Sequence, residues 1–161
     1  MSDLNFAPGK SVPRSSDVEP WIVVIADDEG DVHLITRMVL KNFVFEDRPL
    51  ELISTYSGEE TVQLLEKYPN TAILLLDVVM ESYTAGLDAV DAIREKNGNR
   101  EVRILLRSGQ AGYANVSEVI QQYDVNAFIR KEHITNQNLK DAVLVALRSY
   151  RDIQTAKNRG A

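Results

Sequence analysis

The sequence predicts an α/β protein built on a doubly wound parallel sheet. Five short strand-like segments alternate with five segments of helical periodicity, which is the order in which such a sheet is wound. The most apolar of these runs suit strands that helices cover on both faces. Four of the strands end in polar or charged residues, at the edge of the sheet where ligands bind in this architecture. The 161 residues, 44% of them hydrophobic, suffice for one such domain.

The first expected strand covers residues 21–26 and ends in Asp27 and Asp28. A helix is expected from about residue 31 to residue 42, and a short strand follows near residues 50–54. One face of this helix carries the apolar side chains that we expect in the core, namely Val32, Ile35, Val39 and Phe43.

A capping box over residues 57–60, which read Ser-Gly-Glu-Glu, predicts the start of the second helix. The side chains that this helix should turn toward the core are Val62, Leu64 and Leu65. The next strand covers residues 71–76 and ends in Asp77.

The second half of the chain continues the alternation. A strand over residues 102–107 leads to Ser108, and another over residues 127–130 leads to Lys131. The expected core positions are Leu87, Val90 and Ile93 in the third helix, and Val116, Val119 and Ile120 in the fourth.

The last helix is expected from about residue 136. Its inward positions are Leu139, Val143, Ala146 and Leu147. Apolar residues continue to Tyr150 and Ile153, so that positions 139, 143, 146, 150 and 153 form a heptad-like seam. Two repeats fit either a short coiled coil or a frayed helical tail.

Three carboxylates are expected to meet at the carboxyl edge of the sheet. Asp27 and Asp28 follow one strand and Asp77 follows another. Carboxylates gathered in this way repel one another and call for a cation, and an all-oxygen ligand set suits Mg²⁺. Ser108 and Lys131 end two further strands, where a hydroxyl and an ammonium can hold phosphoryl oxygens. Asp77 would then be the nucleophile that forms an aspartyl phosphate.

Each of these residues also has an ordinary structural interpretation. The acidic pair can cap the following helix, and Ser108 can be a turn residue. A lone Lys131 would be a solvated surface residue. Their joint placement at four strand ends favours the functional interpretation. Two histidines, His33 and His133, have no carboxylate or cysteine partner at ligand spacing, and we expect both on the surface.

At these residues the chain resembles the receiver domain of two-component response regulators. The likeness covers about residues 20–150, and the matching residues are Asp27, Asp28, Asp77, Ser108 and Lys131. It implies a flavodoxin-like (CheY-like) fold, a doubly wound parallel sheet of five strands with five helices. It also implies that the phosphoryl donor is a phosphohistidine on a sensor histidine kinase or a phosphotransfer protein.

The resemblance further implies a metal site. Asp28 would bind Mg²⁺, or Mn²⁺, directly, and Asp27 would help through water. Asp77 and the main-chain carbonyl of Val79 would be further ligands.

The resemblance also implies how the domain works as a switch. Asp77 would be the phosphoacceptor, and Ser108 and Lys131 would assist the transfer. Phosphorylation would then move Ser108 and Phe128, so that the changed surface controls an output domain or a partner.

The chain departs from the family pattern at several places. Glu81 stands where a proline is common, four residues after the acceptor, and the loop to Gly86 looks one residue longer than usual. Glu132 replaces the usual proline after Lys131, so a trans peptide bond is expected there. The stretch 43–50 resembles a narrower group of receivers. These often begin longer chains that carry an HD-type phosphodiesterase, a cyclase or a kinase module.

Composition sets the remaining expectations. Residues 1–19 should form a flexible tail, and residues 151–161 an extension of the last helix or a linker toward an output domain. The net charge of −6 argues against nucleic-acid binding. No apolar run is long enough to cross a bilayer, so we expect a cytoplasmic protein with no membrane partner. A homodimer through the face of the fourth and fifth helices is also expected.

Two other classes of protein fit the sequence less well than a receiver does. Haloacid-dehalogenase-type phosphatases use a similar strand-end Asp, but they need a second Asp two residues later as acid and base, and Val79 stands there. A flavin- or nucleotide-binding module would need a glycine-rich first loop in place of Asp-Asp-Glu. We therefore expect a phosphoacceptor switch, with no enzymatic activity beyond phosphorylating itself and slowly removing that phosphate.

Overall fold

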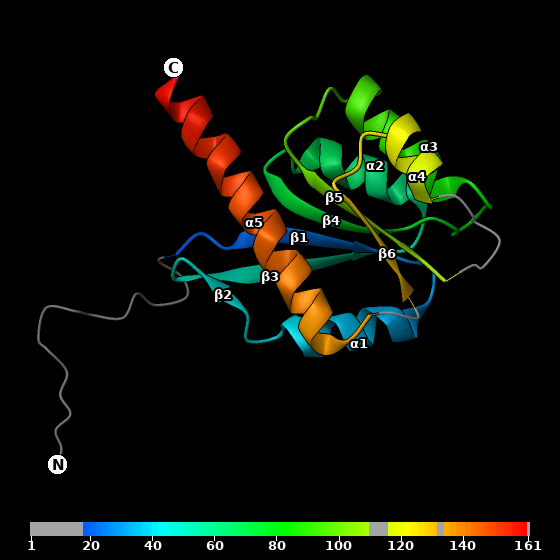
Figure 1. Ribbon diagram of the computed structural model, residues 1–161, viewed down its shortest axis with the longest axis horizontal. Coiled ribbons are helices and arrows are strands. Elements are labelled where there is room, and N and C mark those ends of the chain that lie inside the picture. The colour runs from blue at the N-terminus through cyan, green and yellow to red at the C-terminus, as the bar shows by residue number, and fades with distance from the viewer. Residues whose placement is uncertain (1–17, 110–115, 132–133, 161) are drawn as a thin grey trace, which may run out of the picture.

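In a computed structural model that describes residues 18–109, 116–131 and 134–160, six strands form one sheet in the order β2-β3-β1-β4-β5-β6 (Figure 1). The strands are β1 (Trp21–Ala26), β2 (Val44–Phe45), β3 (Arg48–Thr55), β4 (Thr71–Asp77), β5 (Arg103–Ser108) and β6 (Ala127–Arg130). Five strands pair in parallel, and β2 pairs antiparallel with β3 at one edge. The predicted parallel sheet is confirmed, with one short strand added to it.

The described residues contain the five predicted helices, in two layers. They are α1 (Gly30–Leu40), α2 (Gly58–Lys67), α3 (Ala85–Asp91), α4 (Val116–Gln122) and α5 (Asn136–Arg159), and a π-helical turn, η2 (Ala92–Lys96), continues α3. Side chains of α2, α3 and α4 pack on one face of the sheet, and those of α1 and α5 pack on the other (Figure 1). None of the helices described is long and apolar enough to cross a membrane.

The central strands β1 and β4 are buried along their whole length, because both faces of the sheet are covered. Their side chains alternate between the two layers. Val24 and Leu74 pack under α2 and α3, while Ile25 and Leu75 pack under α1 and α5. This arrangement explains the continuous apolar runs in the sequence.

The inward face of helix α1 matches the predicted one in part, since Val39 and Phe43 pack against the core as expected. Its buried residues are His33, Thr36 and Leu40, whereas Ile35 is 60% exposed. The expectation of a surface position for His33 is therefore wrong. His33 and Thr36 lie inward because they meet polar groups of the sheet, namely the Ser54 hydroxyl and the Arg107 guanidinium.

The start of α2 confirms the predicted capping box. The Ser57 hydroxyl accepts a hydrogen bond from the Glu60 main-chain N–H at 3.1 Å, and the Glu60 carboxylate accepts one from the Tyr56 N–H at 2.7 Å. Glu81 adds a second cap from another loop, because its carboxylate accepts hydrogen bonds from the N–H of Gly58 at 2.8 and 2.9 Å. The residue that replaces the family's proline thus ties the loop after β4 to α2.

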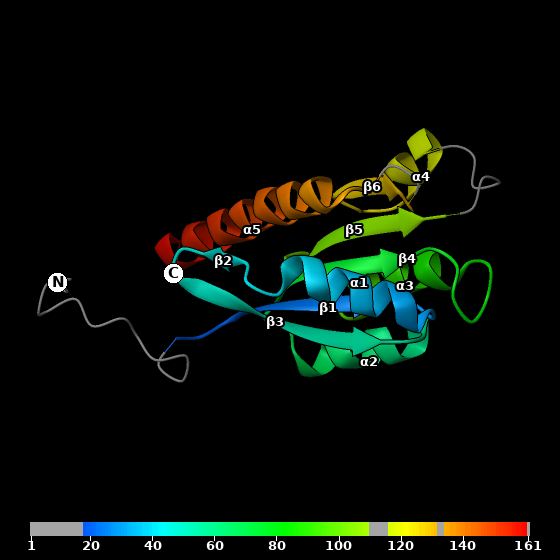
Figure 2. The ribbon, with the colours of Figure 1, turned by 90° about the horizontal axis from the view of Figure 1, so that it is seen from below.

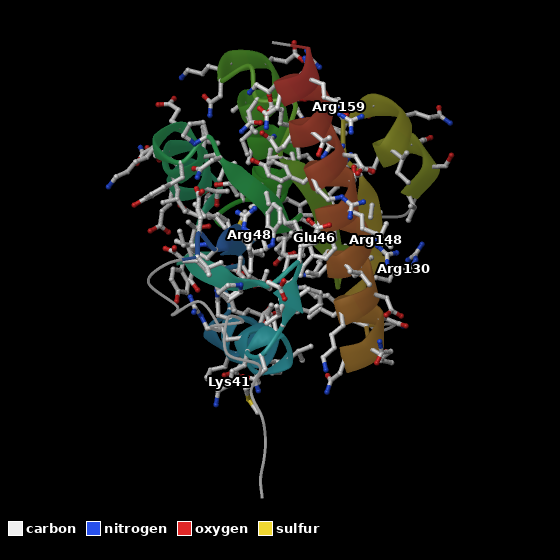
Figure 3. The ribbon with its side chains drawn as sticks, turned by 90° about the vertical axis from the view of Figure 1, so that its left-hand side faces the viewer. Lys41, Glu46, Arg48, Arg130, Arg148 and Arg159 are labelled. Carbon is white, nitrogen blue, oxygen red and sulfur yellow. The ribbon has the colours of Figure 1, made fainter. Side chains whose placement is uncertain are left out.

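The strands β2 and β3 form a hairpin that the sequence did not predict. Its two turn residues, Glu46 and Asp47, have positive φ angles of 50° and 62°, as in the tight turns that suit a hairpin's twist. The hairpin lies beside α5, where Glu46 accepts a 2.6 Å hydrogen bond from Arg151 (Figure 3). Trp21 joins the two, since it packs against both Phe45 and Tyr150.

Helix α5 begins where predicted, at Asn136, and runs back along the sheet toward the amino ends of the strands (Figure 2). Four of the five seam positions, Leu139, Val143, Ala146 and Tyr150, are buried inside the domain. The seam therefore packs on the protein's own sheet. The expectations for His133, for Glu132 and for most of the tail 1–19 fall outside the described residues.

Candidate functional site

Three carboxylates and one lysine meet at the carboxyl edge of the sheet, toward which the arrowheads of β3, β4 and β5 point in Figure 2. Asp27 follows β1, Asp77 ends β4 and Lys131 follows β6. The Lys131 Nζ donates to Asp27 Oδ2 at 3.1 Å and to Asp77 Oδ2 at 3.2 Å. The structure thus brings together residues from the two ends of the chain, as the strand order predicts.

The acidic pair divides into a buried and an exposed member. Asp27 has no exposed surface, whereas Asp28 is exposed. The main-chain N–H of Glu29 donates to Asp27 Oδ1 at 2.9 Å. His33 holds the Asp27 main chain, since its Nε2 donates to the Asp27 carbonyl at 2.7 Å and its Nδ1 lies 2.9 Å from the Ser54 hydroxyl. Asp27 is therefore fixed, and Asp28 is left facing solvent.

The environment of Asp77 disfavours its negative charge. Burial, helped by the nearby charge of Asp27, raises the pKa of Asp77 to about 6, although Lys131 acts in the opposite direction. Burial by itself lowers the pKa of Lys131, but the two carboxylates outweigh it and hold that pKa above its ordinary value. Lys131 is therefore charged at neutral pH, and one lysine incompletely offsets three carboxylates.

A cavity of about 310 Å³ opens over these groups. Its lining residues are Asp28, Glu29, Val32, Asp77, Val79, Gly109 and Lys131. Asp27, Asp28 and Asp77 each place a carboxylate oxygen within 4.8 Å of the others. An oxygen-only set with one exposed member fits a hard divalent cation that keeps several waters. The acidic cluster can thus hold a metal ion.

The loop after β4 is packed tightly against Asp77. The Gly86 N–H donates to the Val78 carbonyl at 2.8 Å. A Cβ atom at Gly86 would lie 2.2 Å from the carbonyl oxygen of Asp77, so this position accepts only glycine. The Val79 N–H points at Asp77 Oδ1 at 3.4 Å, which keeps Val79 next to the carboxylate.

Neither Ser108 nor Phe128 is among the described residues that line this cavity. Ser108 is buried at the end of β5 and pairs with Arg130 in the sheet. It precedes Gly109, where a Cβ atom would lie 3.3 Å from the Lys131 side chain. Phe128 lies opposite Leu106 and packs against the core under α4.

Sequence reasoning missed Arg107, which lies next to Asp77 across the sheet. Its side chain is 3% exposed. Burial lowers the pKa of Arg107, and the charges of Asp27 and Asp77 oppose that change. An arginine in an expected strand is a weak signal of such burial, because Arg103 in the same strand is only partly buried.

Comparison with known proteins agrees with this site. The family model described as the response regulator receiver domain matches residues 23–144. A 3′3′-cGAMP-specific phosphodiesterase 2 from Vibrio cholerae is 45% identical over 135 residues, which are 84% of this chain and 26% of that protein. The chemotaxis protein CheY1 from Helicobacter pylori is 27% identical over 125 residues, covering 78% of this chain and 95% of that one.

A solved structure shows the same fold. The signal receiver domain of a putative LuxO repressor protein from Vibrio parahaemolyticus superposes with a TM-score of 0.72 at 17% identity, covering 86% of this chain and 98% of that one. The chain spans about a quarter of the length of its phosphodiesterase relative and nearly all of CheY1. With the fold, the acidic cluster and the family model in agreement, the chain belongs to the response regulator receiver domains, the phosphorelay switches of two-component signalling.

Proposed function

We propose that Asp77 is the phosphoacceptor of this receiver. The observation that carries the proposal is the double contact of Lys131, whose Nζ bridges Asp77 and Asp27. An Asp77 carboxylate oxygen attacks the phosphorus of a phosphohistidine on a sensor kinase or phosphotransfer protein. An O–P bond forms and the P–N bond breaks, and its electron pair returns to the imidazole, which takes up a proton.

Lys131 and Ser108 are proposed to assist this transfer. Lys131 holds Asp77 in place before the reaction and can contact a phosphoryl oxygen after it, because its ammonium carries three donors. Ser108 ends the neighbouring strand, and its hydroxyl is proposed to turn toward the new phosphoryl group. That movement would free space for Phe128 and reshape the surface near α4 and α5, where a homodimer would form.

The residues proposed to hold Mg²⁺, or Mn²⁺, are Asp28 directly, Asp27 through water, Asp77 and the Val79 carbonyl. All of these donors are oxygens, and Asp28, Asp77 and Val79 share one cavity. A bound ion would neutralise charge on the phosphoryl group during transfer.

The output of the switch is proposed to be control of a cyclic-dinucleotide phosphodiesterase domain. This proposal rests on the 45% identity to the Vibrio cholerae phosphodiesterase, of which this chain matches about a quarter. The receiver itself would have no catalytic activity beyond its own phosphorylation and slow dephosphorylation. Its proposed place of action is the cytoplasm, and its proposed partners do not include nucleic acid or membranes.

Intact-mass measurement after treatment with acetyl phosphate and Mg²⁺ tests the acceptor. Wild type should gain one phosphoryl group, and EDTA or Asp77→Asn should abolish the gain. Asp31→Asn, an exposed change on α1 outside the cluster, should leave it unchanged. Persistent labelling of Asp77→Asn would move the acceptor to another residue and sink the assignment.

A further inference from the structure

The main chain that carries Asp27 and Asp28 is held by two hydrogen bonds on either side of the Asp27 Cα atom. The Asp27 N–H donates to the Thr55 carbonyl at 3.1 Å and so continues the pairing of β1 with β3. The Asp27 carbonyl accepts the 2.7 Å bond from His33 Nε2. This carbonyl belongs to the planar peptide unit that joins Asp27 to Asp28. His33 therefore sets the direction in which the chain leaves β1 and enters Asp28.

The His33 ring is buried, and one tautomer satisfies both of its nitrogens. A carbonyl oxygen can only accept, so Nε2 carries the proton. Nδ1 of the neutral ring then accepts from the Ser54 hydroxyl, whose oxygen lies 2.9 Å away. Arg37 Nη2 donates to the same oxygen at 2.8 Å, which leaves the hydroxyl hydrogen to point at Nδ1. Ser54 and Arg37 thus favour the tautomer that the Asp27 carbonyl requires.

These bonds connect α1 with β3, which lies beside it (Figure 2). His33 and Arg37 are four residues apart on α1, and Ser54 is on β3. Arg37 also donates to the Leu52 carbonyl at 3.2 Å, and the Tyr56 ring centroid lies 4.4 Å from that of the imidazole. The imidazole is therefore held in one orientation by groups of a strand that supplies no expected metal ligand.

The two members of the acidic pair depend on this main chain to different extents. The Asp27 carboxylate is held directly, by Lys131 and by the Glu29 N–H. The exposed Asp28 side chain has no such hydrogen bond within the described residues. Mg²⁺ requires near-ideal geometry from its oxygen ligands. The position of Asp28 as a ligand therefore depends on the peptide unit that His33 holds.

We propose that His33 is a positioning residue for the metal site, and that Ser54 and Arg37 fix its tautomer. This inference rests on the metal site proposed above. His33 would not touch the ion, and it would act through the Asp27 carbonyl on Asp28. Groups that orient metal ligands in this way usually change metal affinity about 10–100-fold when they are removed.

The probe is Mg²⁺ alone, titrated into the ¹⁵N-labelled full chain while the amide shifts of Asp28 and Glu29 are followed. His33→Leu keeps a buried side chain without a donor, and it should raise the dissociation constant at least about tenfold. His33→Gln, whose amide can still donate to the Asp27 carbonyl, should recover most of that loss. Equal losses in the two variants would overturn the proposal, because the donated hydrogen bond would then be irrelevant to the metal.

Ser54→Ala tests the same path without changing the buried ring. It should weaken Mg²⁺ binding on its own and add no further loss to His33→Leu, since the two side chains act through one carbonyl. Thr71→Val is the control, because it removes the hydrogen bond of a buried hydroxyl at the start of β4, at the other end of the sheet. It should leave the affinity unchanged. Additive losses for Ser54 and His33, or a loss in Thr71→Val equal to that in His33→Leu, would contradict the proposal.

Asp28→Ala separates this inference from the metal site on which it rests. Loss of Mg²⁺ binding in Asp28→Ala with none in His33→Leu would overturn the role of His33 and leave the metal site standing. No loss in either variant would overturn both.

Discussion

The two faces of the sheet are built differently. Under α2, α3 and η2, the hydroxyls of Thr55 and Thr61 lie 2.7 Å apart and the buried Arg94 donates to three acceptors, so that the unsatisfied buried atoms there, Asn97 Oδ1 and Asn99 Nδ2, belong to neutral amides. Under α1 and α5, the apolar core gives way toward the carboxyl edge to a polar interior. There Arg107 keeps two unpaired donors, and burial raises the pKa of Asp77 to about 6.

One face of the sheet therefore serves to stabilise the fold, and the other carries the functional groups. Incompletely satisfied polar groups in a protein interior reduce stability and are found where function requires them. The four predictions below test the separation, beginning with the largest expected effect.

Leu76→Ala should destabilise the protein by about 2–5 kcal/mol, because Leu76 is fully buried under α2 and α3 and its loss leaves a cavity. Ile35→Ala on the other face should cost only about 0.5 kcal/mol, since Ile35 is 60% exposed. Equilibrium urea unfolding measures both. Similar losses would show that the exposed face of α1 contributes to the core after all.

Asp77→Asn should stabilise the metal-free protein by about 2–3 kcal/mol at pH 7, because it removes a buried charge whose pKa is raised to about 6. The raised pKa means that the folded state prefers the protonated acid. The gain over wild type should therefore be complete above pH 6 and shrink as the pH falls from about 6 toward the ordinary value of 3.8. Thermal melts across this range check it, and a gain that grows in acid would contradict it.

Asp28→Ala should weaken Mg²⁺ binding more than Asp27→Ala does. Asp28 faces solvent at the cavity, whereas Asp27 is buried and already bound by Lys131 and the Glu29 N–H. We expect Asp27→Ala to weaken binding about tenfold, the lower end of the loss usual for a group that acts through another ligand, and Asp28→Ala to weaken it more than that. Isothermal titration calorimetry measures it, and equal losses would undo this division of roles.

Glu81→Gln should cost about 0.5–1 kcal/mol, as expected for a weakened helix cap. Burial acts against the charge of Glu81, but hydrogen bonds from the main-chain N–H groups of Gly58, of Glu81 itself and of Glu59 lower its pKa. The cap is thus present at neutral pH and is lost in acid, as the carboxylate protonates. Glu60 belongs to the same helix start but bonds Tyr56, so it is no control. Glu66→Gln, at the exposed far end of α2, should have no effect on unfolding.

The sequence predicted the site residues at the carboxyl edge of the sheet better than it predicted which helix faces pack on the sheet. Strand order and strand ends place Asp27, Asp77 and Lys131 together whatever the helices do, because the carboxyl ends of parallel strands share one edge. Helix faces are less certain. On α1, spacing alone does not show that His33 and Thr36 lie inward while Ile35 is exposed, because this depends on the polar groups of the sheet that they meet.

Two other features could not be derived from local pattern. The β2–β3 hairpin depends on positive φ angles at Glu46 and Asp47, which are not glycines or asparagines. Whether the Nε and Nη2 donors of Arg107 find an acceptor depends on side chains from three separate elements. The spacing and composition of the sequence do not show that such an acceptor is missing.

Trp21 contacts both Phe45 and Tyr150, and these ring contacts hold α5 at one point along its length. The helix begins at Asn136, about 21 Å before Tyr150, and continues about 14 Å beyond it. A rigid helix held at that point would act as a lever, so that its start and its end move in opposite directions. Displacement of the end would be about two-thirds of that at the start, by the ratio of these lengths.

Spin labels at Gln137 and Asn158, each paired with one on β3, would measure both movements after phosphorylation. Movement of both ends in the same direction would rule the lever out.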